Sequence, residues 1–312
     1  MRLILYGSGF VLFVLACTAL LMFPTVAAEL YGLERRGKPK IADHPQQETL
    51  LDQYWSVSEV GSNIFAIGEP RYYQYNWSYL IVGSERALLF DTGAGLRDIS
   101  TPIANLTDKP IHVVLSHFHF DHVGGVGAFD NILMLDIPSV RRHAKGDTLN
   151  MSRYQHLGFI DGQSDPRITV SRWFQHGESF DLGDRHLKLF SAPGHTPESV
   201  VVFDPGSDLL FTGDYFYEGN LYAFVPGSSR SSYLETAEML LKHVSPQTRV
   251  YGAHAKSNSV SPPLLSITSL QSLRDQLEIA ESGDQPYDGV LQRYLEIDES
   301  VGFITGPAWT NR

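Results

Sequence analysis

Apolar residues recur along most of the chain in short runs, separated by clusters of glycine, proline and polar residues. Runs of this length, rich in β-branched and aromatic residues, predict strands joined by turns. The predicted strands are residues 63–67, 78–82, 87–91, 111–116, 186–192, 199–204, 208–214 and 248–255. The run IHVVLS at 111–116 has the β-branched content of a strand that is buried on both faces.

Other segments repeat their apolar residues with the spacing of a helix. Helical spacing is found at residues 96–106, at 231–244, which opens with serine, and at 266–281, which precedes a tail of uncertain form. The segment 122–129 reads as the start of a helix in which small residues permit close approach of the backbone. Residues 139–180 are the least regular part and predict a long excursion or a helical insert.

The N-terminal 28 residues have a different composition from the rest of the chain. Arg2 is followed by an apolar run at 3–23 and by small residues up to Ala28, which is the layout of a secretory signal cleaved near Ala28. The same run is long enough to remain as a membrane anchor, because about 20 apolar residues span a bilayer. A lipid attached to Cys17 is a third interpretation, although the apolar run continues past that residue. Each alternative places the folded part outside the cytoplasm, in the periplasm, secreted, or anchored to a membrane.

The predicted domain organisation follows from these segments. Residues 1–28 are a signal peptide or anchor, and residues 29–56 are a polar linker. The folded domain covers 57–260, and the C-terminal helix and tail at 261–312 pack on that domain. A hydrophobic content of 43% with 19% charged residues is ordinary for a globular protein with a sizeable core.

Charge and cysteine content narrow the possible functions. The net charge of −11 repels phosphate backbones, so nucleic-acid partners are not expected. Cys17 is the only cysteine, which excludes a disulfide framework. Any metal site in the mature chain must therefore consist of histidines and carboxylates.

The stretch LSHFHFDHVGG concentrates such residues directly after the strand predicted at 111–116. His117 and His119 alternate, so both side chains can face one metal ion, while Asp121 and His122 can serve a second ion. Zinc favours tetrahedral sites of this chemistry. Because these four residues directly follow a buried strand, they are not expected to be polar surface residues placed there by chance.

Three further donors stand at the ends of predicted strands, where scaffolds commonly place reactive groups. They are His195 in PGHT, Asp214 in FTGD and His254 in GAHA. Each has a structural alternative, because a single histidine can simply be hydrogen-bonded in the core and Asp214 can cap a turn. Taken with the first cluster, seven donors exceed one tetrahedral site and suit two ions roughly 3.5–4 Å apart.

These motifs, in this order and with LLFDTG ahead of them, resemble the metallo-β-lactamase-fold superfamily over residues 57–257. The resemblance implies an α/β fold, a four-layer αββα sandwich, with two zinc ions (alternatively iron or manganese) at one edge of its sheets. It implies a first site of His117, His119 and His195, a second of Asp121, His122 and His254, and a bridging Asp214.

The bridging aspartate makes the chain similar to glyoxalase II-type thioesterases, lactonases and acyl-CoA-hydrolysing members. The resemblance implies a hydrolase in which a bridging hydroxide attacks the carbonyl of a small-molecule ester, thioester, lactone or amide. Asp121 is then expected to orient the hydroxide and to carry a proton to the leaving group. Asp91 either fixes the orientation of a metal-binding side chain or serves only as a turn residue.

Three alternative functions remain open. Persulfide dioxygenases share the histidine motif but hold a single iron, here with His117, His195 and Asp214. Zinc β-lactamases place cysteine or serine near the position of Asp214, so this chain departs from their pattern. A non-catalytic metal-binding protein is the third alternative.

Aromatic residues are dense at 71–79 and 214–224, beside the predicted metal ligands. They can form an apolar substrate pocket, or they can be ordinary core residues with high strand propensity. The pocket candidates are Tyr73, Tyr75, Trp77, Tyr215 and Tyr217.

Overall fold

The computed structural model describes residues 51–257, 259–283, 287–289 and 292–307. The predicted signal peptide or anchor (1–28) and most of the predicted linker (29–56) lie outside the described residues. None of the described helices has the length and apolar character needed to cross a membrane.

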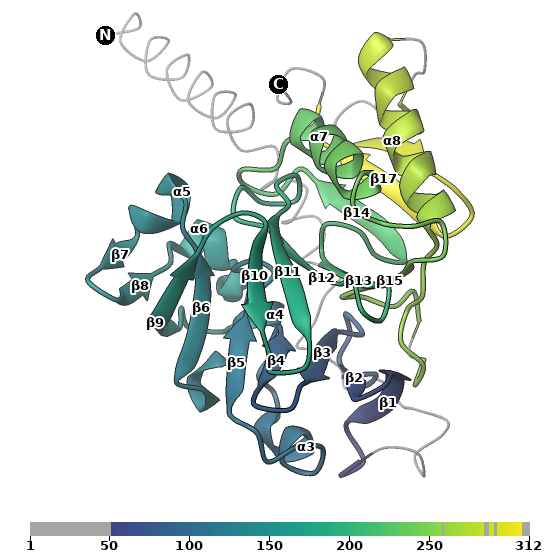
Figure 1. Cartoon of the computed structure of the whole chain (residues 1–312). Helices are drawn as coiled ribbons and strands as arrows, with labels where there is room; N and C mark the ends of the chain where they lie inside the picture. Colours follow the sequence, from purple (N-terminus) through teal and green to yellow (C-terminus); the bar gives the residue numbers. More distant parts are fainter. Residues whose placement is uncertain (1–50, 258, 284–286, 290–291, 308–312) are drawn as a thin grey trace, which may run out of the picture.

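Within the described residues, a nine-stranded sheet contains most of the N-terminal half (Figure 1). Its strands, in spatial order, are β1 (Ser56–Gly61), β2 (Ile64–Gly68), β3 (Trp77–Val82), β4 (Ala87–Phe90), β5 (Ile111–Val114), β6 (Asn131–Leu135), β9 (Arg167–Phe174), β8 (Thr148–Asn150) and β7 (Ala144–Lys145). Strands β1 to β4 form an antiparallel meander, and β4, β5, β6 and β9 then run parallel. The first four strands predicted from the sequence are confirmed as β2 to β5.

A second sheet, five-stranded in the described part of the chain, is built from the C-terminal half. Its order is β10 (Glu178–Asp181), β11 (His186–Ser191), β12 (Val200–Asp204), β13 (Leu209–Gly213) and β15 (Arg249–Gly252). β13 and β15 are parallel, and the chain between them includes the predicted helix, α7 (Arg230–Leu241). The hydroxyl of Ser229 accepts a hydrogen bond from the backbone N–H of Ser232 and caps that helix.

The C-terminal tail is more regular than its sequence suggests. After α8 (Ile267–Ser282) it forms β16 (Arg293–Glu296) and β17 (Val301–Thr305). β17 pairs in parallel with β14 (Gly219–Ala223), so a third sheet joins the tail to the segment that follows β13.

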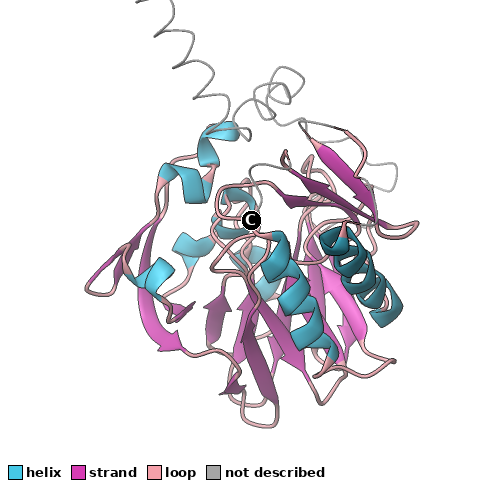
Figure 2. Ribbon diagram, turned by 90° about the horizontal axis from the view of Figure 1, so that it is seen from above, coloured by secondary structure: helices cyan, strands magenta, loops and turns pink. Residues whose placement is uncertain are grey.

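Helices and sheets pack against one another (Figure 2), and buried apolar side chains form clusters between them. Between the two large sheets, the rings of Tyr79 and Phe211 lie 4.8 Å apart and belong to one buried cluster. On the outer face of the nine-stranded sheet, Ile103 joins a second cluster. On the outer face of the five-stranded sheet, Leu240 of α7 and Leu270 of α8 join a third.

The segments between the strands differ in part from the sequence predictions. The helical spacing at 96–106 yields only α3 (Ser100–Ala104), and the helix expected at 122–129 begins earlier, as α4 (Phe120–Val123), before a 3₁₀ turn. The irregular region 139–180 is neither a plain excursion nor a helical insert. It alternates short helices, α5 (Pro138–Arg141), α6 (Arg153–His156) and η3 (Gly158–Ile160), with the strands β7 to β9 that extend the first sheet.

Two glycines allow close approach of the backbone at one end of the second sheet. Gly213 has a φ of +55°, and a Cβ there would lie 2.4 Å from Cβ of Ser116. A Cβ on Gly252 would lie 2.4 Å from Cβ of Tyr217. The two glycines are partners in the parallel register of β13 and β15. Any larger residue at either position must displace a neighbouring segment.

We expect Gly252→Ala to lower the free energy of unfolding by about 1–3 kcal/mol, because the added methyl group overpacks the chain at Tyr217. Urea unfolding monitored by circular dichroism measures the change. Gly127→Ala is the matched control, since no atom lies within 4 Å of the added Cβ. Equal stability of the two variants would contradict the close packing at Gly252.

Candidate metal centre

The seven predicted metal-binding side chains are all buried and gather where strands of both large sheets end. His117 and His119 follow β5, Asp121 and His122 belong to α4, His195 lies between β11 and β12, and Asp214 and His254 follow β13 and β15. The backbone N–H of Val200 donates to the carbonyl of Ser116 at 2.7 Å and joins the two sheets at this edge. Donors from four separate parts of the chain are thereby brought together.

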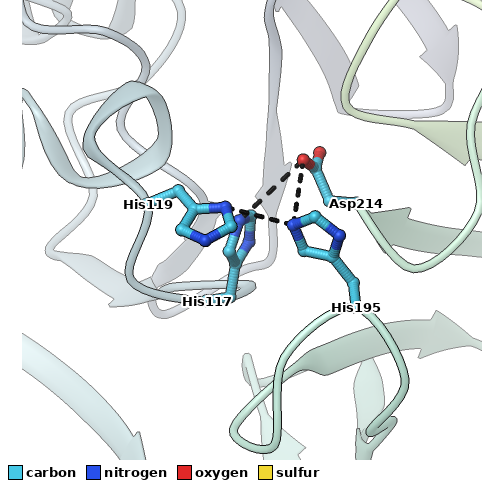
Figure 3. Close-up of side chains that lie close together, drawn as sticks. All are labelled: His117, His119, His195 and Asp214. Carbon is cyan, nitrogen blue, oxygen red and sulfur yellow. Dashed lines mark hydrogen bonds and ion pairs between the residues drawn. The ribbon is translucent and has the colours of Figure 1, made fainter. Parts of the chain in front are cut away.

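The first ligand group consists of His117, His119, His195 and Asp214, whose ligand atoms all lie within 4.8 Å of one another. Figure 3 shows these side chains directed toward a common point. Nε2 of His195 lies 3.1 Å from Nδ1 of His119 and 3.6 Å from Oδ2 of Asp214. Nε2 of His117 lies 3.9 Å from the same carboxylate oxygen.

The second ligand group consists of Asp121, His122 and His254, which satisfy the same distance limit. Oδ2 of Asp121 lies 3.4 Å from Nε2 of His122 and 3.6 Å from Nε2 of His254. Oδ1 of Asp214 lies 3.3 Å and 2.9 Å from the same two nitrogens. Asp214 therefore presents one oxygen to each group, and the two groups fit a dinuclear metal centre.

Unpaired buried atoms support this fit. Nε2 of His117, Nε2 of His122 and Oδ1 of Asp214 are buried and, within the described residues, make no hydrogen bond. Buried polar atoms without partners are costly, and native proteins rarely retain several at one place. Two cations, one in each ligand group, would give all three atoms a partner. Histidine nitrogen and carboxylate oxygen are also the ligands that zinc prefers.

The pKa values of the histidines are shifted in opposite directions in the two ligand groups. Burial, followed by the neighbouring imidazoles, holds the pKa of His117 well below its ordinary value, and burial lowers the pKa of His119 to about 3. Histidines must be neutral to bind a metal, so the first group is ready to do so near neutral pH. Burial also disfavours charge on His122 and His254, but the carboxylate of Asp214 leads the opposing interactions that raise the pKa of both. The second group thus lies in the more negative environment.

Hydrogen bonds to the outer ring nitrogens orient the imidazoles. Nδ1 of His195 lies 2.9 Å from the backbone carbonyl of Tyr222, and Nδ1 of His254 lies 2.9 Å from that of Gln74. A carbonyl only accepts, so each Nδ1 carries the proton and leaves Nε2 free to bind a metal.

Asp91 makes contacts that bear on both interpretations that the sequence left open. It lies in a turn with a φ of +65°, and its Oδ1 accepts from the backbone N–H of Ser116 at 2.6 Å. Its Oδ2 lies 2.8 Å from Nδ1 of His122. The same carboxylate therefore holds the turn and orients one imidazole.

Three polar residues in the connection between β2 and β3 were not predicted from the sequence. Gln74 and Asn76 hydrogen-bond to Asp121. Glu69 accepts from the hydroxyl of Tyr54 at 2.8 Å and from the backbone N–H of Ala94 at 3.0 Å. In the sequence, Gln74 and Asn76 are surrounded by aromatic residues, and no spacing marks them as neighbours of the histidine motif.

A cavity of about 800 Å³ opens onto the two ligand groups. His119, Asp121, His195, Asp214 and His254 form part of its wall. Apolar side chains form much of the rest, including Phe120, Leu157, Ile160, Phe224 and Val225. The metal-binding edge is thus combined with space for an apolar ligand.

The five aromatic pocket candidates separate into two sets. Tyr73, Tyr75 and Tyr217 line the cavity. Trp77 and Tyr215 are fully buried and pack in the clusters on the two faces of the five-stranded sheet. Trp77 is the first residue of β3, and its ring belongs to the buried cluster between the two large sheets.

Residues 72–246 match the family model of the metallo-beta-lactamase superfamily, which is more than half of the chain. The chain belongs to this superfamily. Membership confirms the resemblance drawn from the histidine motif, and with it the expectation of an enzyme of the hydrolase type.

The chain is similar to several named proteins. Acyl-coenzyme A thioesterase MBLAC2 of Bos taurus is 28% identical over 222 residues, which are 62% of this chain and 77% of that protein. Hydroxyacylglutathione hydrolase of Legionella pneumophila (strain Paris) is 26% identical over 143 residues, or 46% of this chain and 47% of that protein. Among solved structures, a metallo-beta-lactamase from Pontibacter korlensis superposes with a TM-score of 0.53 at 18% identity, covering 72% of this chain and 99% of that one. At this identity the superposition shows the shared fold.

We expect Asp214→Ala to lose metal from both ligand groups, because its two oxygens face one group each. His119→Ala should lose most of the metal at the first group. Metal content after dialysis, measured by plasma mass spectrometry, tests both. His186→Ala, at a side chain that is 65% exposed, is the control and should retain the metal content of the wild type. Full metal content in the Asp214 variant would refute the shared position of this carboxylate.

We expect Glu69 to make stability depend on pH. Burial raises its pKa from 4.5 to about 7 in spite of its two hydrogen bonds. The unfolded chain therefore loses this proton at lower pH than the folded protein, so the folded state is progressively destabilised as the pH rises from about 4.5 to above 7. Glu69→Gln cannot ionise, and its stability relative to the wild type should rise across that window by up to about 3 kcal/mol. Urea unfolding at pH 5 and pH 8, with a chelator present, measures the difference. A difference that stays constant or shrinks with pH argues against a buried neutral carboxyl.

Proposed function

We propose that this protein is a dinuclear metal hydrolase that cleaves acyl thioesters at the carbonyl carbon. The carboxylate of Asp214 carries the proposal, because it lies between two ligand groups at the wall of a cavity with apolar sides. Relatives named as acyl-coenzyme A thioesterases support a thioester over the other carbonyl compounds that the sequence allows.

The proposed ligands of the first ion are His117, His119 and His195, those of the second are Asp121, His122 and His254, and Asp214 is shared. Zinc is the proposed metal, because histidine nitrogen and carboxylate oxygen are among its usual ligands. Two bound divalent ions would supply a hydroxide at neutral pH and polarise the carbonyl group of the substrate.

Asp121 is the proposed catalytic residue for proton transfer. Burial opposes its ionisation, but His122 and His254 outweigh this and keep its pKa below the ordinary value. The side chain is therefore a carboxylate near neutral pH, and it also lines the cavity. It can orient the attacking hydroxide and, once the hydroxide oxygen is bonded to the carbonyl carbon, carry the proton of that group to the leaving thiolate.

The apolar part of the cavity is the proposed acyl-binding region. Phe120 and Leu157 belong to a small buried cluster against which Ile160 packs. Phe224 and Val225, which follow β14, also line the cavity. Each methylene group buried against such a surface contributes about 0.8 kcal/mol, so longer acyl chains should be preferred.

The test is a thioester series with one leaving group, N-acetylcysteamine, assayed with full-length, zinc-loaded protein. We expect two metal ions per chain and a kcat/KM that rises roughly fourfold per added methylene group until the cavity is filled. Ile160→Ala should weaken this dependence because it removes part of the wall. Leu264→Ala, at a residue that is 56% exposed, is the matched control and should leave the dependence unchanged.

Other results would replace the proposal. One iron per chain with consumption of oxygen would indicate the dioxygenase alternative. Faster turnover of a β-lactam than of any thioester would indicate a β-lactamase. Metal binding without hydrolysis of esters, thioesters, lactones or β-lactams would indicate a binding protein.

A further inference from the structure

The connection between β2 and β3, residues 69–76, lies against the end of β15. Asn76 and His254 form an antiparallel bridge. Beside it, the backbone N–H of Trp77 donates to the carbonyl of Ala253 at 2.8 Å, and the N–H of Ala255 donates to that of Tyr75 at 3.2 Å. These bonds fix the connection to the segment that carries one member of the second ligand group.

Asn76 makes a second attachment, to Asp121. Its Nδ2 donates to the backbone carbonyl of Asp121 at 2.8 Å and to the carboxylate Oδ2 at 3.1 Å. Both partners are acceptors, so the amide orientation with Nδ2 toward Asp121 is the only one that forms these bonds. The side chain is buried, and its Oδ1 has no hydrogen-bond partner within the described residues. The two hydrogen bonds to Asp121 are therefore the hydrogen bonds of this buried side chain within the described residues.

Gln74 contacts two members of the second ligand group. Its side-chain Nε2 donates to the same Oδ2 of Asp121. Its backbone carbonyl accepts from Nδ1 of His254 at 2.9 Å. Because amides are neutral, they orient the carboxylate without cancelling the negative charge that attracts a cation.

We propose that Gln74 and Asn76 are positioning residues that assemble the second metal site by fixing the carboxylate of Asp121. This inference rests on the dinuclear function proposed above. Asp121 and His254 are 133 positions apart in the chain, and both are held by the same short connection. The hydrogen bonds of the two amide side chains reach Asp121 and do not include the first ligand group among the described residues. Their removal should therefore affect the two metal ions unequally.

The experiment compares full-length wild type with Asn76→Leu and Gln74→Leu, which keep side-chain size and remove the amide. Zinc affinity is measured by competition with a chromophoric chelator, and cobalt-substituted protein reports the coordination by visible spectroscopy. We expect the affinity for the second ion to fall by roughly 10- to 100-fold, as is typical when a group that orients a ligand is lost. The first ion should bind as in the wild type.

Asn131→Leu is the matched control, since its side-chain amide donates to the carbonyl of Ile111 at 3.3 Å, at the start of β5 and away from the ligand groups. It should bind both ions normally. Gln74 lines the cavity, so Gln74→Leu decides the test if the buried Asn76→Leu does not fold. A large excess of zinc should restore the kcat of both amide variants but not that of Asp121→Ala, which lacks both the proposed ligand and the proposed proton carrier.

The outcomes separate the two proposals. An unchanged affinity for the second ion in the folded variants would overturn the positioning role, as would an equal loss of both ions. A wild-type protein that binds only one ion would instead overturn the dinuclear function.

Discussion

The two ligand groups share one buried carboxylate, that of Asp214. The oxygens of Asp214 face opposite ways, with Oδ1 2.9 Å from Nε2 of His254 and Oδ2 3.6 Å from Nε2 of His195. A buried charge is tolerated only when partners surround it. Burial alone would raise the pKa of Asp214, but His254 and His122 reverse the effect and hold it well below the ordinary value. The carboxylate and the imidazoles therefore require each other, and the fold must bring the segments that carry them to one place.

The scaffold meets this requirement at the ends of its strands. Gly213 immediately precedes Asp214, and its positive φ turns the chain at the edge of the sheet. Gly252, its partner in β15, lets the chain after β13 pass within contact distance. Asp91 then fixes the end of β5 through Ser116 and orients His122. Contacts within the protein itself thus fix the backbone around the two ligand groups.

Local patterns were sufficient to predict most of this arrangement. The strands from β2 to β5 and the donors His117 to His122 could be predicted because alternation, apolar runs and motif spacing are properties of neighbouring residues. Trp77 and Tyr215 illustrate the limit, since aromatic content alone does not show which way a ring points. Trp77 packs between the sheets, whereas Tyr217, two positions after Tyr215, reaches the cavity. The pairing of β17 with β14 depends on residues about 80 positions apart, which no local pattern encodes.

The contacts of the Gln74 and Asn76 amides also join residues far apart in the chain, so no local pattern predicts them. These amides connect the second ligand group with the wall of the cavity. Tyr73 and Tyr75 of the same short connection line the cavity, and the residues between and after them hold Asp121. Glu69 fixes one end of the connection to Ala94, and pairing with residues 253–255 fixes the other. This segment is thus attached at both ends, and it carries part of the cavity wall together with the amides that contact Asp121. The part of the cavity wall formed by Tyr73 and Tyr75 and the amides that contact Asp121 therefore belong to one short segment, an arrangement that favours a preorganised site.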